Sequence, residues 1–80
     1  MKTEITLSYP VEMNGETVTC LNMRRMKARD QVAVAKQGGT DAEQEVRLFA
    51  NLCEVAPPVI EELDMKDYRK LQEAYRGFLS

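Results

Sequence analysis

Residues 40–54 read TDAEQEVRLFANLCE and carry the clearest helix signal in this 80-residue chain. Thr40 followed three residues later by Glu43 has the form of a capping box, in which each side chain pairs with the other residue's backbone N–H. Further along, apolar residues recur at spacings of three and four, which places them on one face of a helix. We therefore predict a central helix over 40–54 that buries this face against the rest of the chain. The face comprises Ala42, Val46, Phe49 and Cys53, with Leu48 and Leu52 beside it.

An alternating segment before this helix predicts a β-hairpin over residues 3–24. In residues 4–11, EITLSYPV, every second residue is apolar, which is typical of a half-buried strand. Asn14-Gly15 is a strong hairpin signal, because a type I′ turn needs positive φ at both central positions. Pro10 cannot donate to a ladder, so we place it near the strand's end or on an edge. The residues expected on the buried face are Ile5, Leu7, Tyr9 and Val11.

The returning strand, residues 16–24, leaves its inward face undecided. Val18 and Cys20 lie on one side of it, whereas Leu21 and Met23 lie on the other. A β-bulge, or a position in contact with both sides, would reconcile the two sets. Both interpretations stay open at the level of sequence.

A short helix is predicted over residues 28–37, between the hairpin and the central helix. Ala28, Val32 and Ala35 fall along one side of it, which we expect to pack against the central helix, and Asp30 lies in its first turn. Gly38-Gly39 ends it, because glycine readily adopts the left-handed conformation that follows a helix.

Two proline residues end the central helix, and a last helix follows. Pro57 and Pro58 disfavour helical geometry in the residue before each of them, and Pro58 can start a short turn or helix over 58–63. Residues 65–79 form the predicted C-terminal helix, for which Asp64 is a good cap. Asp67 occupies its third position, and Leu63 and Tyr68 flank the cap as a hydrophobic staple. The apolar stripe of this helix comprises Tyr68, Leu71, Tyr75 and Phe78.

The predicted architecture is one small α+β domain over residues 1–80, with an N-terminal β-hairpin followed by three to four helices. A chain this short buries a limited core, so we expect a partner or a homo-oligomer to cover further apolar surface. The net charge is −2. Residues 1–40 hold six basic and four acidic residues, whereas residues 41–80 hold five and nine, giving +2 and −4.

No segment approaches the length of apolar sequence that a membrane span requires, and no apolar signal core follows Met1. We therefore expect a cytoplasmic protein that does not contact a membrane. Cys20 and Cys53 are isolated and the chain has no His, so two free thiols are expected, with no metal and no cofactor. Without a histidine or an evidently activated nucleophile, the chain is not expected to be an enzyme.

The predicted elements suggest two binding functions, nucleic-acid binding and protein–protein interaction. The predicted helix, Gly-Gly turn and helix resemble a helix-turn-helix in outline, and the basic run 24–29 could contact phosphates. The second helix of that pair would present Asp41, Glu43 and Glu45 to a polyanion, which argues against nucleic acid. Protein–protein interaction is favoured instead, with the basic run solvated or paired with acids of the C-terminal half. Tyr75, Phe78 and Leu79 are the predicted partner-facing residues. Structural roles as caps or core are assigned to Thr40, Glu43, Asp64, Asp67, Phe49 and Val46.

The order of these motifs resembles the small tail assembly chaperones of Mu-like, contractile-tailed phages. The residues that carry the resemblance are Pro10-Val11, residues 14–18, Arg24-Arg25, Asp30, residues 39–45, Leu63-Asp64, Asp67-Tyr68, Leu71-Gln72 and Phe78-Leu79. The resemblance implies a non-enzymatic protein in the cytoplasm of the host bacterium. Such a protein coats the tape-measure protein, keeps it soluble, helps the tail-tube protein to assemble around it, and is absent from the mature virion. It also implies structural roles for Arg25, Asp30, Asp64 and Asp67, as caps and a possible ion pair.

Overall fold

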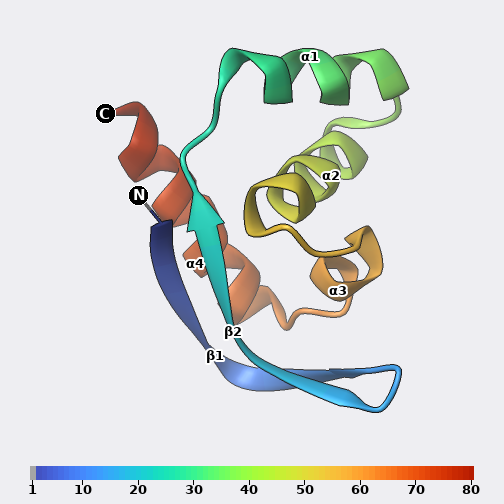
Figure 1. The fold of residues 1–80 in the computed structure, drawn as a ribbon, viewed down its shortest axis with the longest axis vertical. Helices are drawn as coiled ribbons and strands as arrows, with labels where there is room; N and C mark the ends of the chain where they lie inside the picture. The colour runs from blue at the N-terminus through green and yellow to red at the C-terminus, as the bar shows by residue number, and fades with distance from the viewer. Residues whose placement is uncertain (1) are drawn as a thin grey trace.

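A computed structural model describes residues 2–80 and shows an N-terminal antiparallel hairpin followed by helices, the α+β architecture that the sequence predicts (Figure 1). The elements within this range are β1 (Lys2–Met13), β2 (Glu16–Arg24), α1 (Ala28–Gln37), α2 (Asp41–Cys53), α3 (Pro57–Glu61) and α4 (Met65–Leu79). The turn between the strands has positive φ at both Asn14 and Gly15, as a type I′ turn requires.

The hairpin is interrupted by a bulge in β1, and it bends there (Figure 1). Thr6 pairs with Cys20 and Val11 pairs with Val18, so residues 7–10 of β1 lie opposite Thr19 alone. Pro10 falls inside this unpaired stretch, where its missing N–H leaves no gap in the ladder. The bulge settles the inward face of β2, because it brings Val18 opposite Val11 and Leu21 opposite Ile5.

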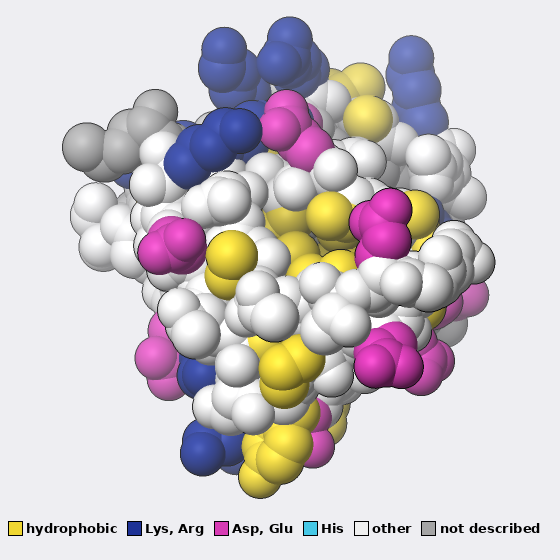
Figure 2. All heavy atoms as spheres, turned by 60° about the horizontal axis from the view of Figure 1, so that its bottom comes forward, with side chains coloured by type: hydrophobic (Ala, Val, Ile, Leu, Met, Phe, Trp, Pro, Cys, Tyr) yellow, Lys and Arg dark blue, Asp and Glu magenta, His cyan; other side chains and the backbone are white. Residues whose placement is uncertain are grey.

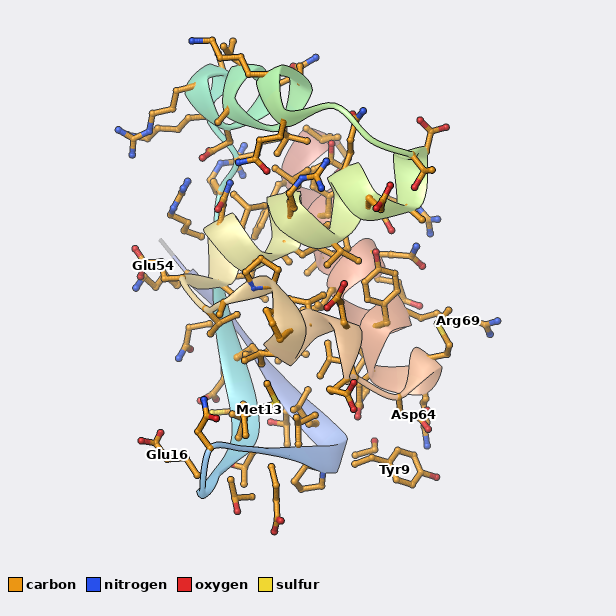
Figure 3. The ribbon with its side chains drawn as sticks, turned by 90° about the vertical axis from the view of Figure 1, so that its right-hand side faces the viewer. Tyr9, Met13, Glu16, Glu54, Asp64 and Arg69 are labelled. Carbon is orange, nitrogen blue, oxygen red and sulfur yellow. The ribbon has the colours of Figure 1, made fainter. Side chains whose placement is uncertain are left out.

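Tyr9 does not join the buried face of β1, so that prediction was wrong. Ile5, Leu7 and Val11 are buried, whereas Tyr9 is 55% exposed. In Figure 3 its ring points away from the strand toward solvent, on the side where Asp64 begins α4. The alternation of a strand holds only while its pairing is regular, and Tyr9 lies in the bulge where the pairing stops.

The α2 helix lies in the middle of the domain and supplies its core. It packs against β2, α1 and α3, while α4 packs against β1 (Figure 1). Phe49 and Leu52 of α2 are completely buried, as are Met23 of the hairpin and Leu71 of α4. Two residues of the predicted stripe differ from expectation: Val46 is half-buried, and Ala42 at the first turn is exposed.

The α1 helix buries a different face from the one that the sequence predicted. Val34 is buried and Val32 is 54% exposed, and Ala28 and Ala35 are exposed as well. The other buried residue of α1 is Asp30, which lies four residues before Val34 and hence on the same face. The Asp30 contacts and the packing of Val34 are therefore both made by the face of α1 that lies against the domain.

No helix within residues 2–80 is long and apolar enough to cross a membrane. Cys20 and Cys53 are free thiols, half-buried and buried respectively. Burial raises the pKa of the Cys53 thiol to about 11, which keeps it protonated at neutral pH.

Candidate partner-binding surface

The basic run 24–29 begins with the last residue of β2, and two of its arginines, Arg24 and Arg25, make contacts within the domain. Arg24 forms two parallel bonds with Asp30, from Nη1 to Oδ2 at 2.9 Å and from Nη2 to Oδ1 at 2.8 Å. The Lys27 backbone N–H also donates to Asp30, at 2.8 Å, and closes the first turn of α1. The acid partner of Arg24 is therefore Asp30 and not an acid of the C-terminal half, whereas Arg25, Lys27 and Arg29 are exposed. The family resemblance implied a structural role for Arg25. The arginine that pairs with Asp30 is its neighbour Arg24.

The Arg24–Asp30 pair should make the protein less stable in acid. The bonds from Arg24 lower the pKa of Asp30 to about 2, from an ordinary value of 3.8. A lowered pKa means stability that is present above the ordinary value and lost as pH falls toward 2. We expect Asp30→Asn to reduce the free energy of unfolding by about 2 kcal/mol at neutral pH. The difference from wild type should shrink between about pH 4 and pH 2.

Urea unfolding of both proteins across this pH range measures the effect. Arg24→Gln is the control, because Asp30→Asn introduced into it should show a smaller effect and a flatter pH profile. An equal penalty for Asp30→Asn at pH 2 and pH 7 would show that the carboxylate charge does not matter.

Arg25 holds the C-terminal end of α4. Its Nη2 donates to the backbone carbonyl of Phe78 at 2.9 Å, and its guanidinium carbon lies 5.6 Å from the centre of the Phe78 ring. A cation at a helix C-terminus is favourable, because the last carbonyls lack helical partners. Phe78 is half-buried, and its ring is in contact with Arg25.

The start of α4 is joined to the bulge of β1. Asp67 accepts from the backbone N–H of Ser8 at 2.8 Å and of Tyr9 at 3.0 Å. Lys70 lies one turn further along, 3.0 Å from Asp67, and donates to the Thr6 carbonyl at 2.8 Å. Burial raises the pKa of Asp67, but the bonds from the two N–H groups and Lys70 outweigh it, so the net pKa is lowered. Asp67 thus satisfies two backbone N–H groups that the bulge removes from the ladder, and Lys70 adds a bond to Thr6, the last paired residue before the bulge.

The capping residues predicted from sequence lie at helix starts. Thr40 Oγ1 accepts from Glu43 N at 3.1 Å, and Glu43 Oε1 accepts from Thr40 N at 2.9 Å. The bond from the Thr40 backbone N–H lowers the pKa of Glu43. Asp64 accepts from the Lys66 backbone N–H at 2.9 Å and caps α4.

An aromatic cluster joins α2 to α4. The Phe49 ring lies 5.5 Å from that of Tyr68 and 5.7 Å from that of Tyr75, centre to centre. The Tyr68 hydroxyl donates to Glu45 at 2.5 Å, and burial together with this carboxylate raises the pKa of Tyr68. Gln72 donates to the same carboxylate oxygen at 2.9 Å. The cluster thus places Tyr75 against the buried ring of Phe49.

An open groove, the α1–α4 groove, lies beyond this cluster. Its volume is about 460 Å³, and a smaller hollow of about 180 Å³ continues it past Met26 and Ala28. Its apolar lining residues are Met26, Val34, Ala35, Leu48, Tyr75 and Leu79. Leu79 is 64% exposed at its rim. The groove therefore collects apolar surface from three helices and from the segment before α1.

The structure separates the three residues predicted to face a partner. Tyr75 and Leu79 both line the α1–α4 groove, whereas Phe78 lies under Arg25. The sequence pattern did not predict the opposite wall, which is formed by Met26, Val34 and Ala35. Met26, an apolar residue within a basic run, was the available signal for it.

A second groove, the α2–α3 groove, lies on another part of the surface. Two hollows of about 360 and 380 Å³ share Ala42, Val46 and Glu61 as lining residues. Pro57 lines the first, and Met65, which is 59% exposed, lines the second. Three acidic residues line the two hollows, against the single cation Arg47; the acids are Glu43, Glu45 and Glu61.

The charged side chains are unevenly distributed over the surface. Figure 2 shows several Lys and Arg side chains along its upper, far edge, where α1 lies, and acidic side chains around the nearer part. Hydrophobic side chains appear between them in separate patches. Within residues 2–80, no three His, Cys, Asp or Glu side chains come together as metal ligands would.

Comparison with known proteins yields one family. The family model described as phage tail assembly chaperone proteins, E, or 41 or 14, matches residues 4–80, which is nearly the whole chain. The comparisons with curated proteins and with solved structures give no match.

Proposed function

This chain belongs to the family of phage tail assembly chaperone proteins, and we propose that it binds the tape-measure protein of a Mu-like, contractile-tailed phage. Membership of the family gives it a role in phage tail assembly. The proposed role is to keep the tape-measure protein soluble in the host cytoplasm and to help the tail-tube protein assemble around it. It acts by binding and not by chemistry, and it leaves before the virion is complete.

The α1–α4 groove is the observation that supports this proposal. It is open, its lining is largely apolar, and one exposed leucine, Leu79, lies at its rim. An amphipathic helix binds such a surface by laying its apolar face into the groove. A tape-measure protein is long and largely helical, so its exposed apolar stripes offer that kind of ligand many times over. Many weak contacts along one extended client then give strong overall binding.

The two walls of the groove are held differently. On the α4 wall, Tyr75 packs on Phe49, which is completely buried. The α1 wall buries only Asp30 and Val34, and its hold on the domain comes from the Arg24–Asp30 pair and the packing of Val34. A wall with so few buried residues can adjust to client helices of differing bulk.

The helix-turn-helix alternative gains no support from the contacts of the basic run. Arg24 is paired with Asp30, and Arg25 is bound to Phe78. The first turn of α2, which would have to enter a groove of DNA, carries Asp41 and Glu43. A polyanion would meet carboxylates there.

Co-expression of the chain with the tape-measure protein of its phage tests the proposal. We expect more soluble tape-measure protein and co-purification of the two proteins. Ala35→Asp and Leu79→Asp place a charge on opposite walls of the groove and should reduce both readouts. Tyr9→Asp is the matched control, because Tyr9 is an exposed apolar residue outside the groove.

Two results would contradict the proposal. No gain in soluble tape-measure protein with the wild-type chain would remove the chaperone function. Equal loss with Tyr9→Asp and Leu79→Asp would remove the groove as the binding site. Mass spectrometry of purified virions separates a chaperone from a structural tail subunit, because only the subunit would remain in the particle.

A further inference from the structure

Among the described residues, 2–80, the lining of the α1–α4 groove contains one charged side chain, Glu45. The other polar residues that line the groove are the uncharged Gln31 and Gln44. Glu45 also lines one hollow of the α2–α3 groove, so it lies at the end of the α1–α4 groove that adjoins that surface. A ligand in the α1–α4 groove therefore meets a carboxylate at this end.

The Glu45 carboxylate is held in place while one of its oxygens stays free. The Tyr68 hydroxyl and the Gln72 amide both donate to Oε1. Within residues 2–80, Oε2 accepts no hydrogen bond and Glu45 takes part in no ion pair. A carboxylate can accept at both oxygens, and its bonds to cationic donors are the stronger ones. Oε2 is thus an oriented acceptor, at a half-buried position, for a cation that a ligand brings.

The other end of the groove is basic. The smaller hollow that continues the groove shares Met26, Gln31 and Leu79 with it, and Lys27 lines this continuation. A further hollow next to it is lined by Lys27 and Arg25. Lys27 is exposed, and its ammonium group is in no ion pair within the described part of the chain. The extended groove therefore runs from an acidic end at Glu45 to a basic end at Lys27, with apolar lining between them.

We propose that the α1–α4 groove selects client helices that carry a basic residue at one end of their apolar stripe and an acidic residue at the other. The basic residue pairs with Oε2 of Glu45, the acidic residue pairs with Lys27, and the apolar stripe contacts Met26 and Leu79 between them. This selectivity rests on the proposed function, because the client is the helical ligand proposed for the same groove.

The two charges also give the groove a direction. A client helix that lies the other way round brings its acidic residue to Glu45 and its basic residue to Lys27, and like charges then repel at both ends. Complementary charges of this kind contribute more to the choice and orientation of a ligand than to its overall affinity. Glu45 and Lys27 are therefore specificity-determining residues, and the apolar lining supplies most of the binding.

Fluorescence anisotropy with labelled synthetic peptides tests this selectivity. The peptides are amphipathic helices of about 20 residues that share one leucine stripe. One peptide has Lys and Glu at the two ends of the stripe, and the other has Gln at both positions. The charged peptide should bind about tenfold more tightly at low salt, because each of two ion pairs contributes about threefold. The difference should shrink when salt is added.

Variants of the chain assign each preference to its residue. Glu45→Gln keeps an acceptor for Tyr68 but removes the charge, so it should abolish the preference for Lys over Gln in the peptide. Lys27→Gln should abolish the preference for Glu over Gln at the other end, and the two pairs should behave as separate double-mutant cycles. Glu73→Gln and Lys36→Gln are the controls, because they remove the same charges at exposed residues outside the groove.

Two results overturn the selectivity: equal affinity for the charged and the uncharged peptide, or a preference that survives both groove variants. If Glu45→Gln destabilises the chain in urea, the exposed Lys27→Gln decides alone. Co-expression with the tape-measure protein keeps this outcome apart from the proposed function. A wild-type chain that solubilises the tape-measure protein but shows no peptide preference loses the selectivity and keeps the function. A chain that shows the preference but does not solubilise the tape-measure protein keeps the selectivity and loses the function.

Discussion

Replacing Phe49 by alanine is expected to lower the free energy of unfolding by about 3–5 kcal/mol. Phe49 is completely buried, and its ring packs between those of Tyr68 and Tyr75. The substitution removes the side chain that joins α2 to α4 and leaves a cavity that the rigid surroundings cannot fill. A core of this size supplies only about 3–5 kcal/mol in total. The variant should therefore be largely unfolded at room temperature, as far-UV circular dichroism and urea titration would show.

Phe49→Leu is the matched control for this experiment. It keeps most of the apolar volume while it removes the aromatic contacts, so a loss of under about 1.5 kcal/mol is expected. If Phe49→Ala remained folded and lost only the ability to keep the tape-measure protein soluble, Phe49 would be a binding residue. The assignment of α2 to the core and of α4 to the client would then be reversed.

The parts of the fold that could be predicted from sequence depend on neighbours in the chain. The Asn14-Gly15 turn, the Thr40–Glu43 capping box and the Asp64 cap each involve residues that lie within four positions of one another. Such interactions depend only on residues close together in the sequence, so a local sequence pattern identifies them. The second half of the α2 stripe is buried as predicted, because a central helix buries most of its apolar residues, whereas Ala42 and Val46 in its first half are not fully buried.

The predictions that failed depend on residues far apart or on competing local signals. The pattern Ala28, Val32, Ala35 indicated one buried face of α1, yet the helix turns its Asp30 side inward to meet Arg24. A paired carboxylate thus outweighed a weak stripe in which two of the three residues are alanine. The exposure of Tyr9 follows from the bulge, whose amides are satisfied by Asp67, 58 residues away from Tyr9 in the chain. The sequence of the strand alone does not indicate that Asp67 is the partner of these amides.

The candidate site was predictable only on its α4 side. Tyr75 and Leu79 belong to an amphipathic helix near the end of the chain, and both line the α1–α4 groove. The opposite wall depends on the rotation of α1 about its axis, which the stripe of Ala28, Val32 and Ala35 does not predict. The same rotation leaves Val32 exposed, on the side of α1 away from the core.

Replacing Asp67 by alanine is the second substitution with a large expected effect. Asp67 is completely buried, and it accepts the backbone N–H groups of Ser8 and Tyr9. Its loss leaves two amide donors without partners and the Lys70 ammonium without its carboxylate. Hydrogen bonds to a charged group contribute more than neutral ones, so we expect the free energy of unfolding to fall by about 3 kcal/mol. Urea titration measures this loss, and amide exchange should be faster at Ser8 and Tyr9.

Asp64→Ala is the control on the same helix, because Asp64 is an exposed cap three positions earlier that makes only a local bond to Lys66. Its expected effect is about 1 kcal/mol, the usual contribution of an N-cap. The pH dependence separates the two roles further. Because the pKa of Asp67 is lowered on folding, its contribution is present above the ordinary carboxyl pKa and disappears in acid. An Asp67→Ala variant no less stable than Asp64→Ala would mean that water replaces the carboxylate at the bulge. The bend of the hairpin would then be maintained by β1 and β2 themselves and not by α4.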